Sequence, residues 1–249
     1  VDFMDVEVKF THLNKGDADH ASIAAASIKL LNYADIDPLI LDMNIFKCSG
    51  HDQLWQGQLE VFDALKEHNM RRLKESGIKI ITCSCAECYR TFAVDYDLPG
   101  TLGIKVEHIT QTLQGRGLKF KAPEDVTVAY HDPCRLGRMM GEYEAPRDLI
   151  QLVDGATMVE LENNKERALC CGVSSMMYCN DATKAVRRKR LDQGTDAGID
   201  LMLGGCPKCY MHMQCMLNEE RMNPDDGHHH DYEMMDLMQF LVACLEEKN

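Results

Sequence analysis

Five cysteines in the C-terminal half of the chain have types and spacings that indicate a metal site. Cys134 is followed after 35 residues by the cysteine pair of CCG (170–172), and 34 residues separate Cys171 from CPKC (206–209). Soft thiolates favour iron–sulfur clusters, zinc or copper(I). Five thiolates exceed the four ligands of a tetrahedral zinc, and an adjacent cysteine pair suits neighbouring irons better than one ion. Structural zinc and a thioredoxin-type dithiol are the alternatives. The expected ligands are Cys134, Cys170, Cys171, Cys206 and Cys209.

Two polar residues beside these cysteines are candidates for a part in the chemistry. The charge of His131 changes near neutral pH, which suits proton donation to a leaving thiolate, but HDP (131–133) is also a turn that ends a strand. Lys208 lies inside the CPKC turn. A cation there would stabilise a reduced, more negative cluster, although exposure in the turn also explains a lysine.

Arg135 and Arg138 follow Cys134 and lie one turn apart if a helix begins there. Their guanidinium groups suit an anionic substrate or a carboxylate. A salt bridge to Glu142 or Glu144 is the structural alternative.

The elements that must position these residues read as an α/β chain, because aliphatic and β-branched segments alternate with amphipathic ones. In the first half we expect strands at 6–10, 39–43, 78–82 and 106–109, and helices at 19–33, 55–76 and 86–96. A polar connector over 115–125 follows. In the second half we expect strands at 126–131, 158–161 and 199–203, and helices at 145–153, 181–197, from Pro207, and 231–247.

The two halves are copies of one unit, offset by about 120 residues. The matching segments are VEVKF (6–10) with VTVAY (126–130), FKCSG (46–50) with ALCCG (168–172), and GIKIITCSCAEC (77–88) with GIDLMLGGCPKC (198–209). A repeat of this length predicts two pseudo-twofold-related α/β lobes, residues 1–115 and 126–249, with metal sites in loops at strand ends.

The composition narrows the function. The net charge of −13 argues against nucleic acid, because phosphate binding needs clustered Lys and Arg. The one basic run, KAVRRKR (184–190), is expected to be a solvated helix face, with a docking patch as the alternative. HHH (228–230) is expected in an exposed loop. The chain has twelve cysteines, many of them in clusters rather than scattered, and shows no signal peptide or apolar span. These features predict a reducing, cytoplasmic location, with membranes reached only through partners.

HDPCRLGR (131–138), LCCGVSS (169–175) and GGCPKC (204–209) resemble the CCG cysteine-rich domain of heterodisulfide reductase catalytic subunits. The resemblance extends from about Val6 to Cys215. It implies two α/β lobes with the clusters near their interface. It also implies a non-cubane [4Fe-4S] cluster on the five C-terminal cysteines, at which a disulfide of a small thiol or a protein is cleaved or formed. It also implies partners: a ferredoxin-like iron–sulfur subunit and a flavoprotein or membrane cytochrome subunit. Some relatives instead relay electrons from flavin dehydrogenases for glycerol 3-phosphate, glycolate or lactate toward quinone.

The first half departs from this motif. Asn14 stands where Cys134 aligns, and Ser49 replaces the second cysteine of the pair. An ordinary second [4Fe-4S] cluster on the remaining thiols and an empty site are both open. The candidate ligands are Cys48, Cys83, Cys85 and Cys88.

Overall fold

The computed structural model describes residues 20–40, 45–173, 180–223, 227 and 229–246. The first half contains α1 (His20–Tyr33), α2 (His51–Trp55), α3 (Leu59–Ser76), β1 (Ile80–Cys83), α4 (Ala86–Arg90), the π-helical turn η1 (Thr91–Asp95), α5 (Leu98–Leu102), β2 (Lys105–His108) and α6 (Ile109–Leu113). The second half contains β3 (Phe120–His131), α7 (Glu144–Gln151), β4 (Val153–Val159), the 3-10 turn η2 (Lys165–Arg167), α8 (Asp181–Asp196), β5 (Leu201–Gly204), α9 (Pro207–Met222), β6 (Glu233–Asp236) and α10 (Leu237–Ala243).

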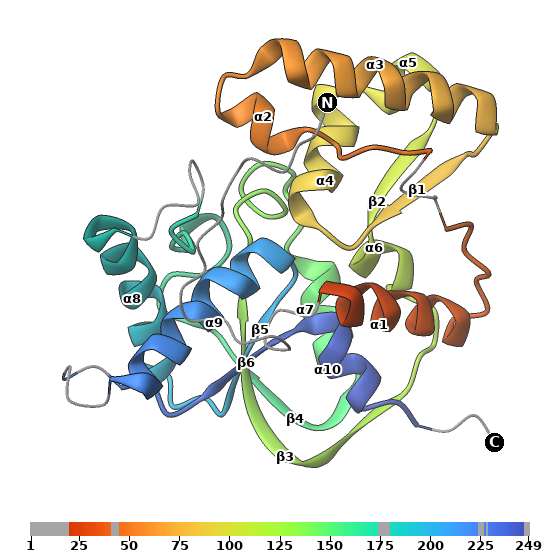
Figure 1. Cartoon of the computed structure of the whole chain (residues 1–249). Helices are drawn as coiled ribbons and strands as arrows, with labels where there is room; N and C mark the ends of the chain where they lie inside the picture. The colour runs from red at the N-terminus through yellow and green to blue at the C-terminus, as the bar shows by residue number, and fades with distance from the viewer. Residues whose placement is uncertain (1–19, 41–44, 174–179, 224–226, 228, 247–249) are drawn as a thin grey trace.

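Two parallel sheets organise the chain into α/β lobes (Figure 1). The larger sheet has the order β4-β3-β5-β6, and β1 and β2 form the smaller one. Because side chains alternate across a strand, the larger sheet buries two faces. Ala129 and Met202 join a core with residues of α8 and α9, whereas Val128 and Leu203 join a core with α1, α7 and α10.

The lobes share these cores. The core on the α8–α9 side continues into residues of α3, β1 and α4, and α1 packs against α10 (Figure 1). A hydrogen bond of 2.6 Å joins Gln239 Nε2 to Ser22 Oγ across that helix pair. The repeated units are therefore packed as one body and bury apolar surface in common.

The structure confirms the repeat at the level of register. In the first half Cys83 of β1 pairs with His108 of β2, and in the second half Gly204 of β5 pairs with Asp236 of β6. His108 and Asp236 then cap α6 and α10 by accepting backbone N–H groups with their side chains. Each CxxC segment follows a repeated strand, so its first cysteine stands just before a helix.

Three of the expected elements differ from the observed ones. The helix expected over 55–76 is two helices, because Gly57 adopts φ 77° between α2 and α3. The connector expected over 115–125 lies partly in β3, where Phe120 and Ala122 alternate inward between polar neighbours. The strand expected at 158–161 begins earlier, because Val153 pairs with Phe120 ahead of a register shift.

The expectation of a single helix over 231–247 is also wrong. EMMD (233–236) forms β6, and α10 starts only at Leu237. The apolar positions of this short strand fit a helical stripe as well, and pairing with β5 decides the outcome. The strand expected at 6–10 lies outside the described residues, as do Asn14 and most of the strand expected at 39–43, of which 39–40 is irregular.

Within the described part of the chain, no helix combines the length and apolar character that crossing a membrane requires.

Candidate metal centre

The structure brings the five C-terminal cysteines together. Thiol–thiol hydrogen bonds link Cys134 to Cys170, Cys170 to Cys171, Cys171 to Cys209 and Cys209 to Cys206. Cys134 lies three residues after β3 and Cys206 two residues after β5, while the Cys-Cys pair precedes α8. Neighbouring parallel strands end at one sheet edge, which is why residues more than 70 positions apart meet there.

Burial differs among these thiols. Cys171, Cys206 and Cys209 are at most 4% exposed, whereas Cys134 and Cys170 are half-buried. The hydrogen bond with Cys170 raises the pKa of Cys171 to about 12, and burial adds to it. Hydrogen bonding to Cys170, again with burial, also raises the pKa of Cys134. Without a cation nearby, Cys134 and Cys171 therefore stay protonated near pH 7, and their ionisation requires a positively charged partner.

The glycine of the CCG motif holds the cysteine pair against α8. Gly172 adopts φ 81°, and its N–H donates to Cys170 Sγ at 3.3 Å. A Cβ here would lie 2.8 Å from the carbonyl oxygen of Thr183 on α8. Only glycine therefore combines this backbone conformation with such close packing.

The expectation of a solvated basic face on α8 is wrong for two of its arginines. Arg187 and Arg190 are among the largest fully buried side chains. Three residues apart, they lie on one helix face, which turns inward here. Arg190 has no carboxylate within ion-pair distance among the described residues, and burial lowers its pKa to about 10. This buried positive charge lies close to the thiols.

His131, at the end of β3, lies between Arg190 and the thiols. Arg190 Nε donates to His131 Nδ1 at 3.0 Å. A ring nitrogen of His131 and the sulfurs of Cys171 and Cys209 lie within 4.8 Å of one another. Burial, with help from the Arg190 cation, lowers the pKa of His131 to about 3, so the ring is neutral. Asp132, next in sequence, is instead bound by Arg147 through two hydrogen bonds of 2.7 and 2.9 Å.

Neither arginine after Cys134 forms the expected salt bridge to Glu142 or Glu144. Arg135 is buried, stacks 3.6 Å from the ring centroid of Trp55 and approaches Glu87 at 3.9 Å. Arg138 donates to the carbonyl oxygens of Glu166 and Ala168. The chain is not helical at this point, so the assumed one-turn spacing does not apply.

Lys208 is not simply exposed in its turn, since only 12% of its side chain is accessible. It pairs with Asp52 and, at 3.0 Å, with Glu87, and His51 contacts Glu87 at 2.6 Å. Burial lowers the pKa of His51, but the hydrogen bond and charge of Glu87 outweigh it, and the net shift is upward. These four residues form an ion cluster between the lobes, directly beside both CxxC turns.

The first-half cysteines lie beside the second-half set. Cys85 forms thiol hydrogen bonds with Cys206 and Cys88, which lower its pKa. Ser49 Oγ lies 3.3 Å from Cys88 Sγ, at the place that Cys171 takes relative to Cys209. Cys48 is exposed and Cys83 is buried in β1.

Sequence reasoning missed His108 and Glu87. His108 is fully buried and bonds the carbonyl oxygen of Gly205, just before Cys206, through Nε2 at 3.2 Å. Glu87 occupies the position in CAEC that Lys208 occupies in CPKC, and opposite charges at equivalent positions of a twofold repeat are a usable pairing signal. The exposed-loop expectation for the histidine run is wrong for His230, which is buried against Glu220 at 2.6 Å.

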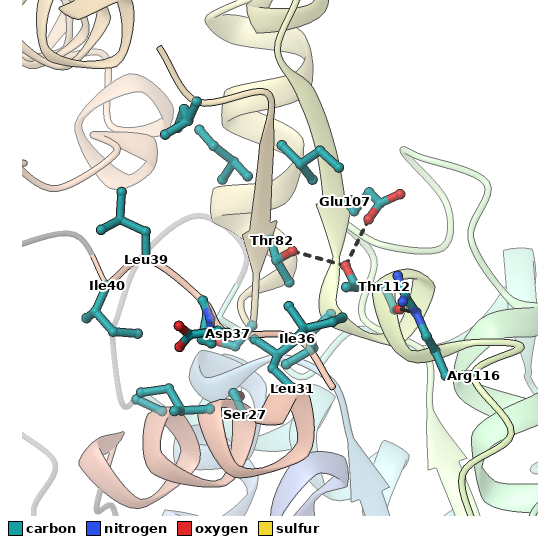
Figure 2. Close-up of a pocket in the computed structure, with 18 residues that line it drawn as sticks. Ser27, Leu31, Ile36, Asp37, Leu39, Ile40, Thr82, Glu107, Thr112 and Arg116 are labelled. Carbon is teal, nitrogen blue, oxygen red and sulfur yellow. Dashed lines mark hydrogen bonds between the residues drawn. The ribbon is translucent and has the colours of Figure 1, made fainter. Parts of the chain in front are cut away.

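A separate cavity of about 540 Å³ lies between α1 and β1 (Figure 2). Its lining is mostly aliphatic, with Thr82, Thr112 and Glu107 joined by hydrogen bonds on one wall. No cysteine is among the residues that line it. This cavity is therefore distinct from the thiol site.

Comparison with known proteins agrees with the geometry. The model of the CCG cysteine-rich domain matches twice, at residues 14–93 and 128–214. The chain is 31% identical over 213 residues to a subunit of the dihydromethanophenazine:CoB–CoM heterodisulfide reductase of Methanosarcina barkeri, covering 81% of this chain and 52% of that protein.

Two further relatives carry names that indicate other roles. The probable iron-sulfur-binding oxidoreductase FadF of Bacillus subtilis is 30% identical over 193 residues, covering 75% of this chain and 27% of FadF. EtfAB:quinone oxidoreductase of Syntrophomonas wolfei is 27% identical over 207 residues, covering 78% and 28%. The chain thus spans about half or less of the length of these relatives. With two matches that cover more than half of its residues, the chain belongs to the CCG cysteine-rich domain family.

Proposed function

We propose that this chain is the iron–sulfur catalytic subunit of a heterodisulfide reductase-like complex. In this proposal Cys134, Cys170, Cys171, Cys206 and Cys209 hold a non-cubane [4Fe-4S] cluster, at which a disulfide, persulfide or trisulfide is reduced or formed. The unbroken series of thiol contacts through these five residues is the observation that carries the proposal.

The surroundings fit an anionic iron–sulfur group. Five soft donors converge, and thiolates bound to iron carry negative charge that needs compensation. The buried guanidinium of Arg190 provides positive charge without a carboxylate partner among the described residues. The buried Nε2 of His131 has no hydrogen-bond partner in that same part of the chain, and it points to an acceptor that is added with the cluster.

Access supports a role in thiol chemistry. The cluster supplies the one-electron steps and an iron that takes a substrate thiolate. Among the five cysteines only Cys134 and Cys170 are half-buried, so a substrate sulfur reaches the site from their side. Cys171, Cys206 and Cys209 close the opposite side against solvent.

In the first half, Cys48, Cys83, Cys85 and Cys88 are the donors for a second [4Fe-4S] cluster. The hydroxyl of Ser49 occupies the place of a fifth sulfur, so the site suits an ordinary cubane rather than the non-cubane type. Cys85 is hydrogen-bonded to Cys206 of the second-half set. A cluster in the first half would therefore have a short path for electrons to the second-half site.

The likeness to one subunit of a heterodisulfide reductase supports electron-transfer partners for this chain. We propose a ferredoxin-like iron–sulfur subunit together with a flavoprotein or membrane cytochrome subunit. A relay role toward quinone is the second candidate, and the likeness to EtfAB:quinone oxidoreductase favours it.

Anaerobic purification with iron and sulfide quantitation tests the cluster, and electron paramagnetic resonance (EPR) tests its role. We expect at least four irons per chain, and an EPR signal that changes when a thiol is added. Colourless, iron-free protein rules out both candidates. A loaded cluster that no thiol or disulfide perturbs leaves the relay as the function.

A further inference from the structure

The imidazole of His131 lies between a cation and two of the thiols. It is 1% exposed, its Nδ1 faces Arg190, and it shares a 4.8 Å sphere with the sulfurs of Cys171 and Cys209. Such a group has two possible roles: it is a ligand of the metal, or it is a hydrogen-bond donor to the sulfurs that are ligands.

The contact with Arg190 decides between these roles. Arginine only donates, so the 3.0 Å bond from Arg190 Nε leaves Nδ1 of His131 without a proton. A neutral ring then carries its proton on Nε2. To ligate a metal through Nε2, the ring would have to place the proton on Nδ1, directly against the N–H of Arg190.

Arg190 is itself held in place by the protein. Its Nη1 donates to the carbonyl oxygen of Asn163 at 2.6 Å and to Gln193 Oε1 at 2.8 Å. The side chain is fully buried, so it cannot swing away to release the ring.

The Nε2–H that results is buried and has no partner among the described residues. A buried donor left unpaired costs about 1–3 kcal/mol. Thiolate sulfur is a far better acceptor than a neutral thiol because it carries charge. The missing partner therefore becomes available when Cys171 and Cys209 bind metal as thiolates.

We propose that His131 donates an Nε2–H···S hydrogen bond to the sulfur of Cys171 or Cys209 in the loaded site, and that Arg190 is the positioning residue that fixes its tautomer. This inference rests on the proposed cluster. Hydrogen bonds to ligand sulfur disperse negative charge, so the bond stabilises the reduced cluster and raises its reduction potential.

The tautomer is testable without iron or activity. In iron-free protein labelled with nitrogen-15 histidine, NMR should show His131 with Nδ1 unprotonated and Nε2 protonated, assigned with the His131→Gln variant. A proton on Nδ1 overturns the proposal. This measurement reads the tautomer from the native side chain, and the His131→Gln variant serves only to assign the signal.

The hydrogen bond is testable in reconstituted protein. Pulsed EPR should detect weak coupling to an imidazole nitrogen that is absent in His131→Phe, and one deuterium-exchangeable proton that this variant loses while that of the Gly172 N–H remains. Strong nitrogen coupling means a ligand, and no coupling means no bond, and either result overturns the proposal. If the protein binds no iron, the proposed cluster fails as well, which separates that failure from a loaded cluster without the bond.

The reduction potential gives the size of the effect. In His131→Phe we expect the ratio of reduced to oxidised cluster at a fixed potential to fall about tenfold, or about 59 mV for one electron. His131→Gln keeps an N–H donor and should recover part of the shift. His230→Phe removes a buried histidine that bonds Glu220 and Asp192, and should leave the potential unchanged. Equal potentials in His131→Phe and the native protein contradict the proposal.

Discussion

The CSG turn of the first half and the CCG turn of the second half have the same backbone but different chemistry. Gly50 and Gly172 adopt φ 78° and 81°, and their N–H groups donate to the sulfurs of Cys48 and Cys170 at 3.5 and 3.3 Å. Between them, Ser49 stands where the second half has Cys171. Both lobes thus have the same glycine-ended turn. The side-chain atom of its middle residue, oxygen in Ser49 or sulfur in Cys171, changes what the turn can bind.

The side chains that surround the CSG and CCG turns also differ. Beside the second-half turn, α8 buries Arg187 and Arg190. Beside the first-half turn, Asn69 of α3 bonds the backbone of residues 47 and 48. Two buried guanidinium groups thus accompany the CCG turn, whereas an amide holds the CSG turn, and His51 of the ion cluster contacts Ser49 there. The positive charge beside the CCG turn therefore has no equivalent on α3 beside the CSG turn.

Exchanging the differing atom is expected to have the largest effect. Cys171→Ser should abolish iron binding in the second half, because the residue is buried and bonded to both Cys170 and Cys209. Iron and sulfide per chain measure the loss. Cys244→Ser, a buried thiol at the end of α10, is the control and should retain iron.

The reciprocal change, Ser49→Cys, adds a sulfur beside Cys88 and should increase the iron bound by the first half. Full iron in Cys171→Ser would show that the comparison of the two turns is mistaken.

Substitution of Gly172 and of Gly50 by alanine should lower the free energy of unfolding by different amounts. Gly172→Ala places a Cβ 2.8 Å from a backbone oxygen of α8 and should destabilise the protein by about 3 kcal/mol. Gly50→Ala meets the ends of Phe62 and Leu65 at 3.0 and 3.1 Å, which can move, and should cost about 1–2 kcal/mol. Denaturant unfolding of iron-free protein measures both.

Gly198→Ala is the matched control for backbone strain, since it has φ 63° and nothing within 4 Å of the added Cβ. Its cost should be about 1 kcal/mol. Equal costs at all three positions would mean that crowding against α8 has no part in holding the cysteine pair.

The equivalent caps of α6 and α10 should respond to pH in opposite directions. Burial lowers the pKa of His108 from 6.5 to about 4, so the unfolded chain binds more protons and stability falls as pH drops below 6.5. Burial raises the pKa of Asp236 from 3.8 to about 7, so the folded chain binds more protons and stability falls as pH rises from 4 to 7.

Each effect amounts to about 2 kcal/mol between pH 5 and pH 7, and the two nearly cancel. His108→Asn should make the protein lose stability over that interval, and Asp236→Asn should make it gain stability. Unfolding at the two pH values measures this. Unchanged pH profiles in both variants would contradict the assignment.

The charge pair at the third position of the two CxxC turns should have the smallest effect. Glu87 and Lys208 lie 3.0 Å apart but share Asp52 and His51, so each keeps a partner when the other is removed. A double-mutant cycle of Glu87→Gln and Lys208→Met should give a coupling of about 1 kcal/mol. A coupling energy of zero would mean that the Glu87–Lys208 pair does not hold the two lobes together.

Sequence patterns were sufficient to predict the helices and strands with clear periodicity and to identify the spacing of the candidate ligands. The helices expected at 19–33 and 181–197 match α1 and α8 within one residue, and a capping box of Asn180 and Thr183 fixes the start of α8. The strand–helix unit at 233–243 was mistaken for one helix, although comparison with KVEHITQTL (105–113) contains the correction. The repeat was thus a better guide than local periodicity.

The linear order of residues was enough to establish the repeated α/β unit, the missing first-half ligands and a five-cysteine motif in the second half, since these depend only on residue type and spacing. Folding in three dimensions settled the rest. Arg187 and Arg190 are buried, Arg190 donates to Nδ1 of His131, and Glu87 pairs with Lys208. Each outcome depends on which helix face turns inward or which loops meet across the lobes. Long-range packing sets those relations, and a local pattern does not encode them.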